Sequence, residues 1–591
     1  MLPFFSRGKK ILEQSKAVES SQIEKLDQKL VTSLAGKQFP KIHQWKLLPK
    51  FLTLGEKRLL KIIGVAALIG AALFAFFLSR DESRLEPASG GSLHEGVVGT
   101  PRFINPIRAA SDADRDLARL IFSSLLFYDA NGILRNDLAE NVETNDSGAL
   151  YTFTLKEAYW HDGEPVRAED VLFTIKAIQD PAWKSPLWRS FKGVEVSAID
   201  DRTVQFKLEK PYAPFIHALT VGIAPAHLWH NLDPEIAHLS VWATKPIGSG
   251  PWQFDTLTKT KEGALISYTL KKNTGYYGAV PWLDSLTISF YQNLKSALRA
   301  LKENRIESLA FIPSSMRPEL PNKRVNSHPL SIPSYTAVFW NARKNTSLEG
   351  AEVRRALSLA IDRQALSKET GGAPLDGLSD LLNAQTENLA KPQNLEEAQN
   401  LLSKNGWQKK DSFWQKNGEV LSLTLTSLLD PDYQKISEIL AKSWETLGVK
   451  TSIATLDPAE LKEALKTRNY EALLWGQILG GSHDLFPLWH SSQTDDPGLY
   501  LSSIKNRAVD ALLENLTAVS DTAKQREGFE KIETLMEENP PAAILLRPTY
   551  WYAMTKNAHG VVLQNIFTPA DRFLEASAWY VKRKFSFFKV Q

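Results

Sequence analysis

The side chains best suited to chemistry lie in two short segments of the chain. Trp160-His-Asp-Gly163 places an imidazole beside a carboxylate, a pair that could act as a base and an acid. His483, Asp484 and His490 could ligate a metal ion, although their spacing fits neither a helical pair nor a tight loop. The sequence contains no P-loop, no H-E-x-x-H and no G-x-S-x-G motif. We therefore expect no enzyme, no cofactor and no metal site.

The composition excludes several further classes of protein. None of the 591 residues is cysteine, which excludes disulfides, cysteine-ligated zinc, iron–sulfur clusters and thiol catalysis. It also excludes a lipid anchor on an N-terminal cysteine. The hydrophobic content of 43% and the charged content of 23% are ordinary for a globular chain, and 16 Trp and 15 Tyr supply many rings for a core or a cleft.

An apolar run near the N-terminus predicts a membrane span. Residues 62–78 carry no charge, and with Leu59, Leu60 and Lys61 they reach the length that crosses a bilayer, about 20 residues. We predict a transmembrane signal anchor at residues 59–79. A cleaved signal peptide is the competing interpretation, but such a segment begins closer to the N-terminus.

The charges on either side of this run predict its orientation. Residues 1–61 contain 13 Lys and Arg against 5 Asp and Glu, a net charge of +8, whereas the whole chain carries +3. The positive-inside rule then places the basic arm, residues 1–58, in the cytoplasm and the remainder outside the plasma membrane or in the periplasm. Neither part favours nucleic-acid binding, because the outer part is mildly acidic.

The rest of the chain reads as one large α/β region without internal repeats. A linker is expected at residues 80–92, where Gly and Ser are frequent, and the folded part should begin near Leu93. Apolar residues at helical spacing predict a helix over residues 352–366. A second helix should end at Leu447 with Gly448 as its C-terminal cap.

An ordered set of motifs resembles one family. Strand-like alternation from Tyr151 leads into Trp160-His-Asp-Gly163 and then a helix near Ala168, as in the W-x-D-G-x-P-[VL]-x-A-x-D-V segment of the family 5 extracellular solute-binding proteins. These proteins are the peptide and oligopeptide receptors of ABC importers. Further segments are similar to family motifs in the same order: 99–107, 125–129, 247–251, 339–342, 353–363, 480–492 and 507–513.

The resemblance implies a bilobed fold of the type II periplasmic-binding-protein class. Residues 93–334 together with 547–591 would form the first lobe, and residues 335–546 the second. Two connecting strands would act as the hinge, and solute would bind between the lobes as they close. The resemblance also implies that the Trp160 segment is a structural turn, in which Gly163 permits the backbone geometry and the tryptophan packs beneath the next helix.

The candidate ligand-binding residues combine amides and charged groups with two aromatic rings, and they are Asn105, Trp340, Asn341, Arg343, Trp475, Gln477 and Asp484. In the family's peptide receptors an aspartate upstream of a D-P step binds the ligand's amino terminus. Here Gly481 occupies that position, and Asp484 is the nearest carboxylate.

The sequence therefore predicts a membrane-tethered receptor that is not an enzyme. It would capture a peptide or another small solute and deliver it to the permease of an ABC transporter. The alternative is a ligand sensor that signals through the transmembrane helix to the cytoplasmic arm.

Overall fold

The computed structural model describes residues 52–80, 85–145, 147–330, 332–382, 391–519, 521–563 and 566–585. The chain divides into two compact units. One comprises residues 1–86 with 584–591, and the other comprises residues 87–583.

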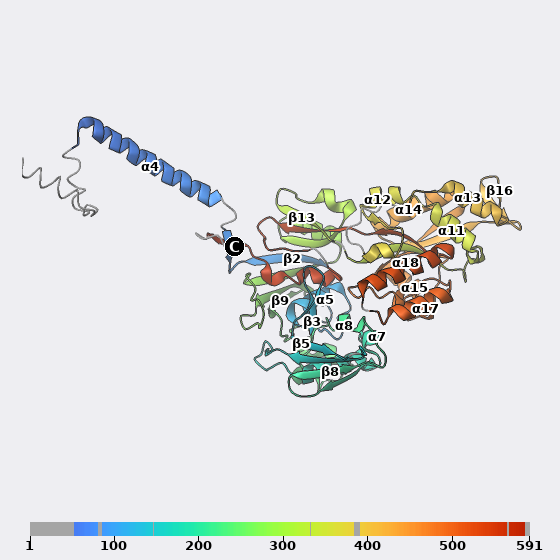
Figure 1. Cartoon of the computed structure of the whole chain (residues 1–591), viewed down its shortest axis with the longest axis horizontal. Coiled ribbons are helices and arrows are strands. Elements are labelled where there is room, and N and C mark those ends of the chain that lie inside the picture. The colour runs from blue at the N-terminus through green and yellow to red at the C-terminus, as the bar shows by residue number, and fades with distance from the viewer. Residues whose placement is uncertain are drawn as a thin grey trace, which may run out of the picture. The chain divides into compact units, whose positions relative to one another are not determined.

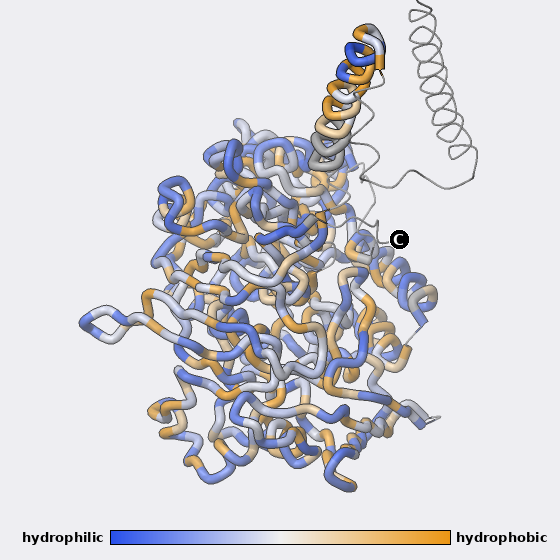
Figure 2. The backbone as a smooth tube through the Cα atoms, turned by 90° about the vertical axis from the view of Figure 1, so that its left-hand side faces the viewer, coloured by the Kyte–Doolittle hydropathy of each residue, from blue (hydrophilic) through white to orange (hydrophobic). Residues whose placement is uncertain are grey.

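The described part of the first unit is mainly one helix, α4 (Leu54–Arg80). Figure 2 shows hydrophilic residues in its first turns and hydrophobic residues after them. This helix contains the predicted span, residues 59–79. Within the described residues, however, no helix has both the length and the apolar character that crossing a bilayer requires. The structure therefore does not support the predicted transmembrane helix. The predicted arm, residues 1–58, lies outside the described residues as far as residue 51.

Two larger sheets and a two-stranded sheet, β3 (Leu126–Tyr128) with β4 (Leu134–Asn136), form the first part of the large unit, which we call the first lobe. The largest one is mixed, and its strands lie in the order β13 (Val325–Leu330), β23 (Tyr550–Thr555), β12 (Ser308–Pro313), β2 (Ser92–Val98), β11 (Ser285–Tyr291), β10 (Leu265–Lys272) and β9 (Trp252–Lys259). The second one has the order β5 (Ala139–Thr144), β6 (Leu150–Leu155), β8 (Thr203–Lys207) and β7 (Glu195–Ala198). The main helices of this lobe are α5 (Asp112–Ile121), α6 (Ala168–Gln179) and α10 (Leu294–Lys302), with short helices α7 (Trp188–Phe191), α8 (Phe215–Ala218) and α9 (Ala226–Trp229).

A six-stranded sheet forms the second lobe. Its order is β15 (Ala373–Pro374), β22 (Ala542–Arg547), β14 (Ser334–Trp340), β21 (Ala472–Ile478), β19 (Ser422–Leu428) and β20 (Lys450–Leu456). The helices of this lobe are α11 (Ala351–Leu359), α12 (Arg363–Thr370), α13 (Leu395–Lys404), α14 (Pro431–Leu447), α15 (Pro458–Thr467), α16 (Phe486–Trp489), α17 (Arg507–Leu516) and α18 (Thr522–Glu538). In Figure 1 they gather at the right-hand end of the domain, and β5 and β8 lie at its lower edge.

The chain passes between the two large sheets twice, each time within a few residues. It leaves β13 of the first lobe and enters β14 of the second, and it later leaves β22 and returns to β23. Within the second lobe, β14 and β22 are hydrogen-bonded neighbours. Two short adjacent connections of this kind are the arrangement expected of a hinge between two lobes.

The turn around Trp160 has the structural role that the resemblance implied. Gly163 has a φ of +94°, a conformation that favours glycine, and the indole nitrogen of Trp160 donates to Asp170 of α6 at 3.3 Å. His161 is hydrogen-bonded to Gly250 through Nε2 at 3.0 Å, and its Nδ1 accepts from the amide of Gly248 at 3.2 Å. The imidazole thus joins two of the predicted motifs instead of facing a substrate.

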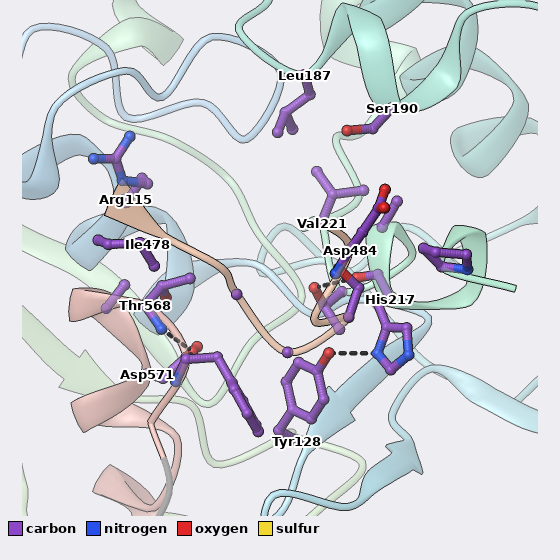
Figure 3. A pocket seen from close by; sticks show the side chains of 18 of the residues that line it. Arg115, Tyr128, Leu187, Ser190, His217, Val221, Ile478, Asp484, Thr568 and Asp571 are labelled. Carbon is purple, nitrogen blue, oxygen red and sulfur yellow. Dashed lines mark hydrogen bonds between the residues drawn. The ribbon is translucent and has the colours of Figure 1, made fainter. Parts of the chain in front are cut away.

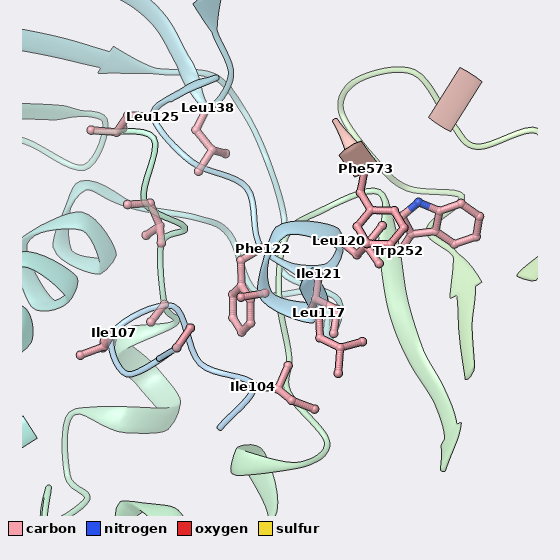
Figure 4. Packing of buried hydrophobic residues seen from close by; sticks show 14 of the residues in the cluster. Ile104, Ile107, Leu117, Leu120, Ile121, Phe122, Leu125, Leu138, Trp252 and Phe573 are labelled. Atoms are coloured by element: carbon pink, nitrogen blue, oxygen red, sulfur yellow. The ribbon is translucent and has the colours of Figure 1, made fainter. Parts of the chain in front are cut away.

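Helix α5 is held by a continuous apolar core. Its N-terminus carries a capping box between Ser111 and Asp114. Leu117 and Ile121 are fully buried and belong to the same cluster as Trp252 and Phe573 (Figure 4). This packing fixes the helix that carries Arg119, discussed below.

Three local expectations meet different outcomes. Gly448 caps α14 with a φ of +102°, which confirms the predicted helix end. The predicted helix over 352–366 is instead two helices, because Asp362 caps a new helix by accepting from the amide of Ala365 at 2.9 Å. Gly90, expected in the linker, donates to the carbonyl of Trp282 at 2.7 Å, so ordered backbone begins before Leu93.

Candidate functional site

A cavity of about 500 Å³ lies between the two lobes. The first lobe contributes residues from α5, from α7 and α8 with the loops next to them, and from the segment that begins at Phe567. The second lobe contributes residues 478–482, Asp484 and neighbouring positions. Most of the wall is apolar, including Phe122, Phe191, Phe215 and Leu488. Figure 3 shows Leu187 and Val221 in the same wall. A wall of this kind with a few polar groups suits an organic ligand.

Asp484 is a carboxylate of the second lobe in this wall. Its Oδ2 accepts a short hydrogen bond from the hydroxyl of Tyr212 in the first lobe, and its Oδ1 accepts from the amide of Phe486 at 3.0 Å. Within the described part of the chain it forms no ion pair. Burial raises the pKa of the Asp484 carboxyl, while the hydrogen bonds from Tyr212 and Phe486 lower it in part. A positively charged partner would therefore stabilise the charged form of this carboxylate.

A tyrosine of the first lobe also lines this cavity and is held by its own lobe. The Tyr128 hydroxyl lies 2.5 Å from Nδ1 of His217, and the centroid of the Tyr128 ring lies 4.3 Å from that of Phe567. Burial lowers the pKa of His217 to about 4, with a smaller contribution from His483, so the imidazole is neutral at pH 7 and can accept a hydrogen bond from the phenol. A Cβ atom at Gly481 would overlap the Tyr128 hydroxyl. Gly481 therefore allows the second lobe to approach this tyrosine.

An ion pair lines another part of the same cavity. Nη2 of Arg119 lies 3.0 Å from Oδ1 of Asp571. The other oxygen of Asp571 accepts from the backbone amides of Thr568 at 2.8 Å and Phe567 at 3.2 Å. Arg115 lines the rim and pairs with Asp112 at 2.6 Å. Figure 3 shows Arg115 and Asp571 on the side of the cavity away from Asp484.

The other histidines and carboxylates do not converge on a metal position. His490 lies 3.4 Å from Glu514 and 3.9 Å from Asp510, away from Asp484. Among the described residues, no group of three or more His, Cys, Asp and Glu side chains could hold a metal ion. The cavity is thus equipped to bind a ligand through hydrogen bonds, charge and apolar contact.

Of the seven predicted site residues, Asp484 lines the cavity and the others have different surroundings. Trp340, the last residue of β14, is fully buried in the second-lobe core, with its ring centroid 6.0 Å from that of Trp444. The side-chain amide of Asn341 donates to the carbonyls of Arg468 and Tyr470, both at 2.9 Å. Both side chains therefore make contacts within the second lobe: Trp340 because β14 is buried on both of its faces, and Asn341 because its amide is engaged by these two carbonyls.

The remaining four predicted residues also make structural or surface contacts. Asn105 is buried and its Oδ1 accepts from the amide of Ile107 at 2.8 Å. Arg343 is exposed and pairs with Asp495 at 2.8 Å. The Trp475 ring lies 6.3 Å from that of Tyr433. Gln477 accepts from Tyr335 and donates to the carbonyl of Leu499 at 2.8 Å.

The sequence analysis missed the first-lobe residues of the cavity. Tyr212 lies between two prolines, in Pro211-Tyr-Ala-Pro214, and such an aromatic residue on a loop is a signal that could have identified it. Tyr128, His217 and Arg119 carry no comparable local signal, since only the fold brings them to one cavity.

Comparison with known proteins agrees with this architecture. The family model described as "Bacterial extracellular solute-binding proteins, family 5 Middle" matches residues 134–498. The oligopeptide-binding protein AppA of Bacillus subtilis (strain 168) is 26% identical over 513 residues, which cover 82% of this chain and 91% of the relative.

Two solved structures share the fold. One is AppA from Bacillus subtilis in complex with a nonapeptide, with a TM-score of 0.68 and 23% identity over 84% of this chain and 100% of that one. The other is NikZ from Campylobacter jejuni in complex with Ni(L-His), with a TM-score of 0.69 and 23% identity over 83% of this chain and 99% of that one. The expected bilobed α/β fold is thereby confirmed. The ligands of these two structures differ, so the fold by itself does not specify a ligand.

Proposed function

Because the chain belongs to the bacterial extracellular solute-binding proteins of family 5, we propose that it captures a peptide between its lobes and delivers it to an ABC transporter. It is a binding protein and not an enzyme. The family and the oligopeptide-binding relative support peptide as the ligand class.

The observation that carries the proposal is the carboxylate of Asp484 in the cavity wall. It has no cationic partner among the described residues, and its environment disfavours the charged form. A peptide's terminal ammonium would supply the missing charge and donate up to three hydrogen bonds. The apolar walls would take the first side chains, where contacts with rings and aliphatic groups contribute affinity without directional demands.

Capture would then proceed by closure of the lobes around the ligand. Tyr212 and Asp484 belong to different lobes, so a ligand bound to Asp484 is also close to one of the hydrogen bonds that join the lobes. A ligand that touches both lobes favours the closed form by its differential affinity for it. The closed form would be the species that the permease recognises.

The test is thermal unfolding of the full chain with a panel of short peptides, their N-acetylated forms, the nickel–histidine complex and sugars. A ligand at one hundred times its Kd stabilises the folded state by about 2.7 kcal/mol, which is readily detected. We expect a rise in Tm with peptides that have a free amine, and none after acetylation. A rise with another solute class alone would replace peptide as the ligand, and no rise at all would contradict a receptor of small solutes.

Membrane attachment is a separate part of this proposal and rests on the sequence. The uncharged run at residues 62–78 follows a basic segment, which is the pattern of an outward-facing signal anchor. The binding domain would then lie outside the cell membrane. We expect the full chain to resist alkaline extraction from membranes and a variant lacking residues 59–79 to be released. Release of the full chain would contradict the anchor.

Uptake measurements in cells that produce the full chain or a truncated variant distinguish the receptor from the sensor alternative. Deletion of residues 2–50 leaves the proposed anchor and the binding domain in place. Uptake of the bound peptide should persist in this variant if the chain is a transport receptor. Intact uptake with a lost transcriptional response to the peptide would instead favour the sensor.

A further inference from the structure

One guanidinium in the interlobe cavity is only partly used by the protein. Arg119 lies in the last turn of α5 and half-buried in the cavity wall, with its side chain 19% exposed. Of its five N–H donors, the described part of the chain engages Nη2 alone, through Asp571 at 3.0 Å. Nε and Nη1 contact no acceptor within that part. Donors of a charged group that stay unpaired in such a site favour a ligand that carries acceptors.

Asp571, the partner of Arg119, does not engage Nε or Nη1 of the guanidinium. Asp571 is engaged at both oxygens, because its second oxygen accepts from the amides of Phe567 and Thr568 at the start of a short 3-10 helix. It therefore fixes the position of Arg119 without covering the rest of the guanidinium. Arginine in a fixed position binds a carboxylate with two parallel hydrogen bonds.

The cavity therefore carries a carboxylate on one lobe and, on the other, a guanidinium with donors that no described residue engages. Asp484, which lacks a cation among the described residues, belongs to the second lobe, and Arg119 belongs to the first. Arg115 adds a second guanidinium at the rim on the Asp571 side (Figure 3). Apolar side chains, including Phe122 and Val221, line the same cavity.

We propose that Arg119 holds the terminal carboxylate of the ligand, so that the chain selects short zwitterionic peptides with apolar side chains. The proposal rests on the function proposed above and specifies its ligand further. A peptide held at both ends must fit its backbone between Asp484 and Arg119, so length is selected together with charge. A longer peptide would lose one of the two terminal contacts.

The experiment measures binding of dileucine, trileucine and tetraleucine to the full chain by calorimetry. Each peptide is supplied as the free acid, as the C-terminal amide and in N-acetylated form. We expect amidation to weaken binding of the best free acid about tenfold or more, since a charge-assisted hydrogen bond is lost. In Arg119→Gln the free acid and the amide should bind equally, and Arg119→Lys should restore part of the difference.

A matched control is Arg135→Gln, because Arg135 also pairs with an aspartate, Asp129 at 2.9 Å, but lies outside the cavity lining. The Arg135→Gln variant should keep the full difference in affinity between the free acid and the C-terminal amide. Equal binding of acid and amide by the wild type, with binding abolished by N-acetylation, would overturn the carboxylate site and leave peptide capture intact. An unchanged difference in folded Arg119→Gln would also overturn it. If no form of any of these peptides binds, both the inference and peptide capture fail.

Discussion

The hydroxyl of Tyr212, in the first lobe, donates a short hydrogen bond to the carboxylate of Asp484, in the second lobe. The two residues are separated by 272 positions in the sequence. One interaction thereby joins the two lobes and fixes the carboxylate that we assign to the ligand's amine. Ligand binding and lobe closure should therefore depend on the same pair of side chains.

Replacing Asp484 with Asn should weaken the binding of peptides that have a free amine by about 10- to 100-fold, since a charge-assisted contact is lost. N-acetylated peptides should bind the variant and the wild type alike. Calorimetry with both peptide forms measures the effect. Asp495→Asn is the control, because Asp495 lies on the same lobe but pairs with Arg343 at the surface. A loss of the same size for acetylated peptides would contradict amine recognition.

The same substitution should make the unliganded protein more stable at neutral pH. Burial raises the folded-state pKa of Asp484, so the folded protein retains this proton to a higher pH than the unfolded chain does. The free energy of unfolding therefore falls as pH rises through this window, and Asn removes that loss. For ligand binding the sign is opposite. Affinity for an amine should fall as pH drops through the raised pKa of Asp484, and binding to Asp484→Asn should lack this pH dependence.

Replacing Tyr212 with Phe should open the lobes of the unliganded protein. The variant removes one hydrogen bond between the lobes, worth about 1 kcal/mol, and leaves the carboxylate with the amide of Phe486 as its donor. Because the chain has no cysteine, Lys192→Cys and Lys524→Cys place two labels on exposed positions of opposite lobes. In Tyr212→Phe the distribution of distances between the two labels should become broader and extend to longer values than in the labelled wild type.

The control for this measurement is Tyr159→Phe, since Tyr159 is exposed and donates to Glu157 within its own lobe. Its distance distribution should match that of the labelled wild type. An unchanged distribution in Tyr212→Phe would mean that the contact does not hold the lobes.

Replacing Gly481 with Ala should impair closure without unfolding the domain. The added methyl group would overlap the Tyr128 hydroxyl of the opposite lobe, so the lobes must separate or the ring must move. We expect weaker peptide binding with little change in the free energy of unfolding, and recovery of binding in the double variant Gly481→Ala, Tyr128→Ala. Gly275→Ala is the control, since its Cβ would approach no atom closer than 3.5 Å. Full affinity in Gly481→Ala alone would contradict this close approach.

The turn at His161 should contribute a pH-dependent stability. Burial lowers the pKa of this imidazole to about 4 from an ordinary value of 6.5. Below pH 6.5 the unfolded chain takes up the proton first, so stability is complete above that value and falls as pH drops toward 4, by up to about 3 kcal/mol. Denaturant unfolding from pH 7 to 4 should show a smaller decline for His161→Asn.

His238→Asn provides the comparison, because His238 is an exposed histidine of the same lobe. Its decline with pH should equal that of the wild type. If the free energy of unfolding declines equally in the wild type, His161→Asn and His238→Asn, then His161 does not contribute to the pH dependence of stability.

The sequence by itself determined the features that depend on local backbone geometry and on ordered motifs. Gly163 and Gly448 stand where a positive φ is required, and the Trp160 turn precedes its helix as expected. These features depend on neighbours within a few residues, which the sequence displays directly. The ordered motifs likewise identified the family and its bilobed fold.

The tertiary structure alone decided which side chains line the cavity. Trp340 and Asn341 were expected there from the chemistry of an aromatic ring and an amide, but burial of β14 on both faces places Trp340 in the second-lobe core, and the Asn341 amide is engaged by backbone carbonyls. Tyr212 and Arg119 reach the cavity because long-range packing brings loops and helix α5 to the face of the other lobe. Contacts between residues hundreds of positions apart leave no local pattern, since their geometry is the sum of all the packing between them.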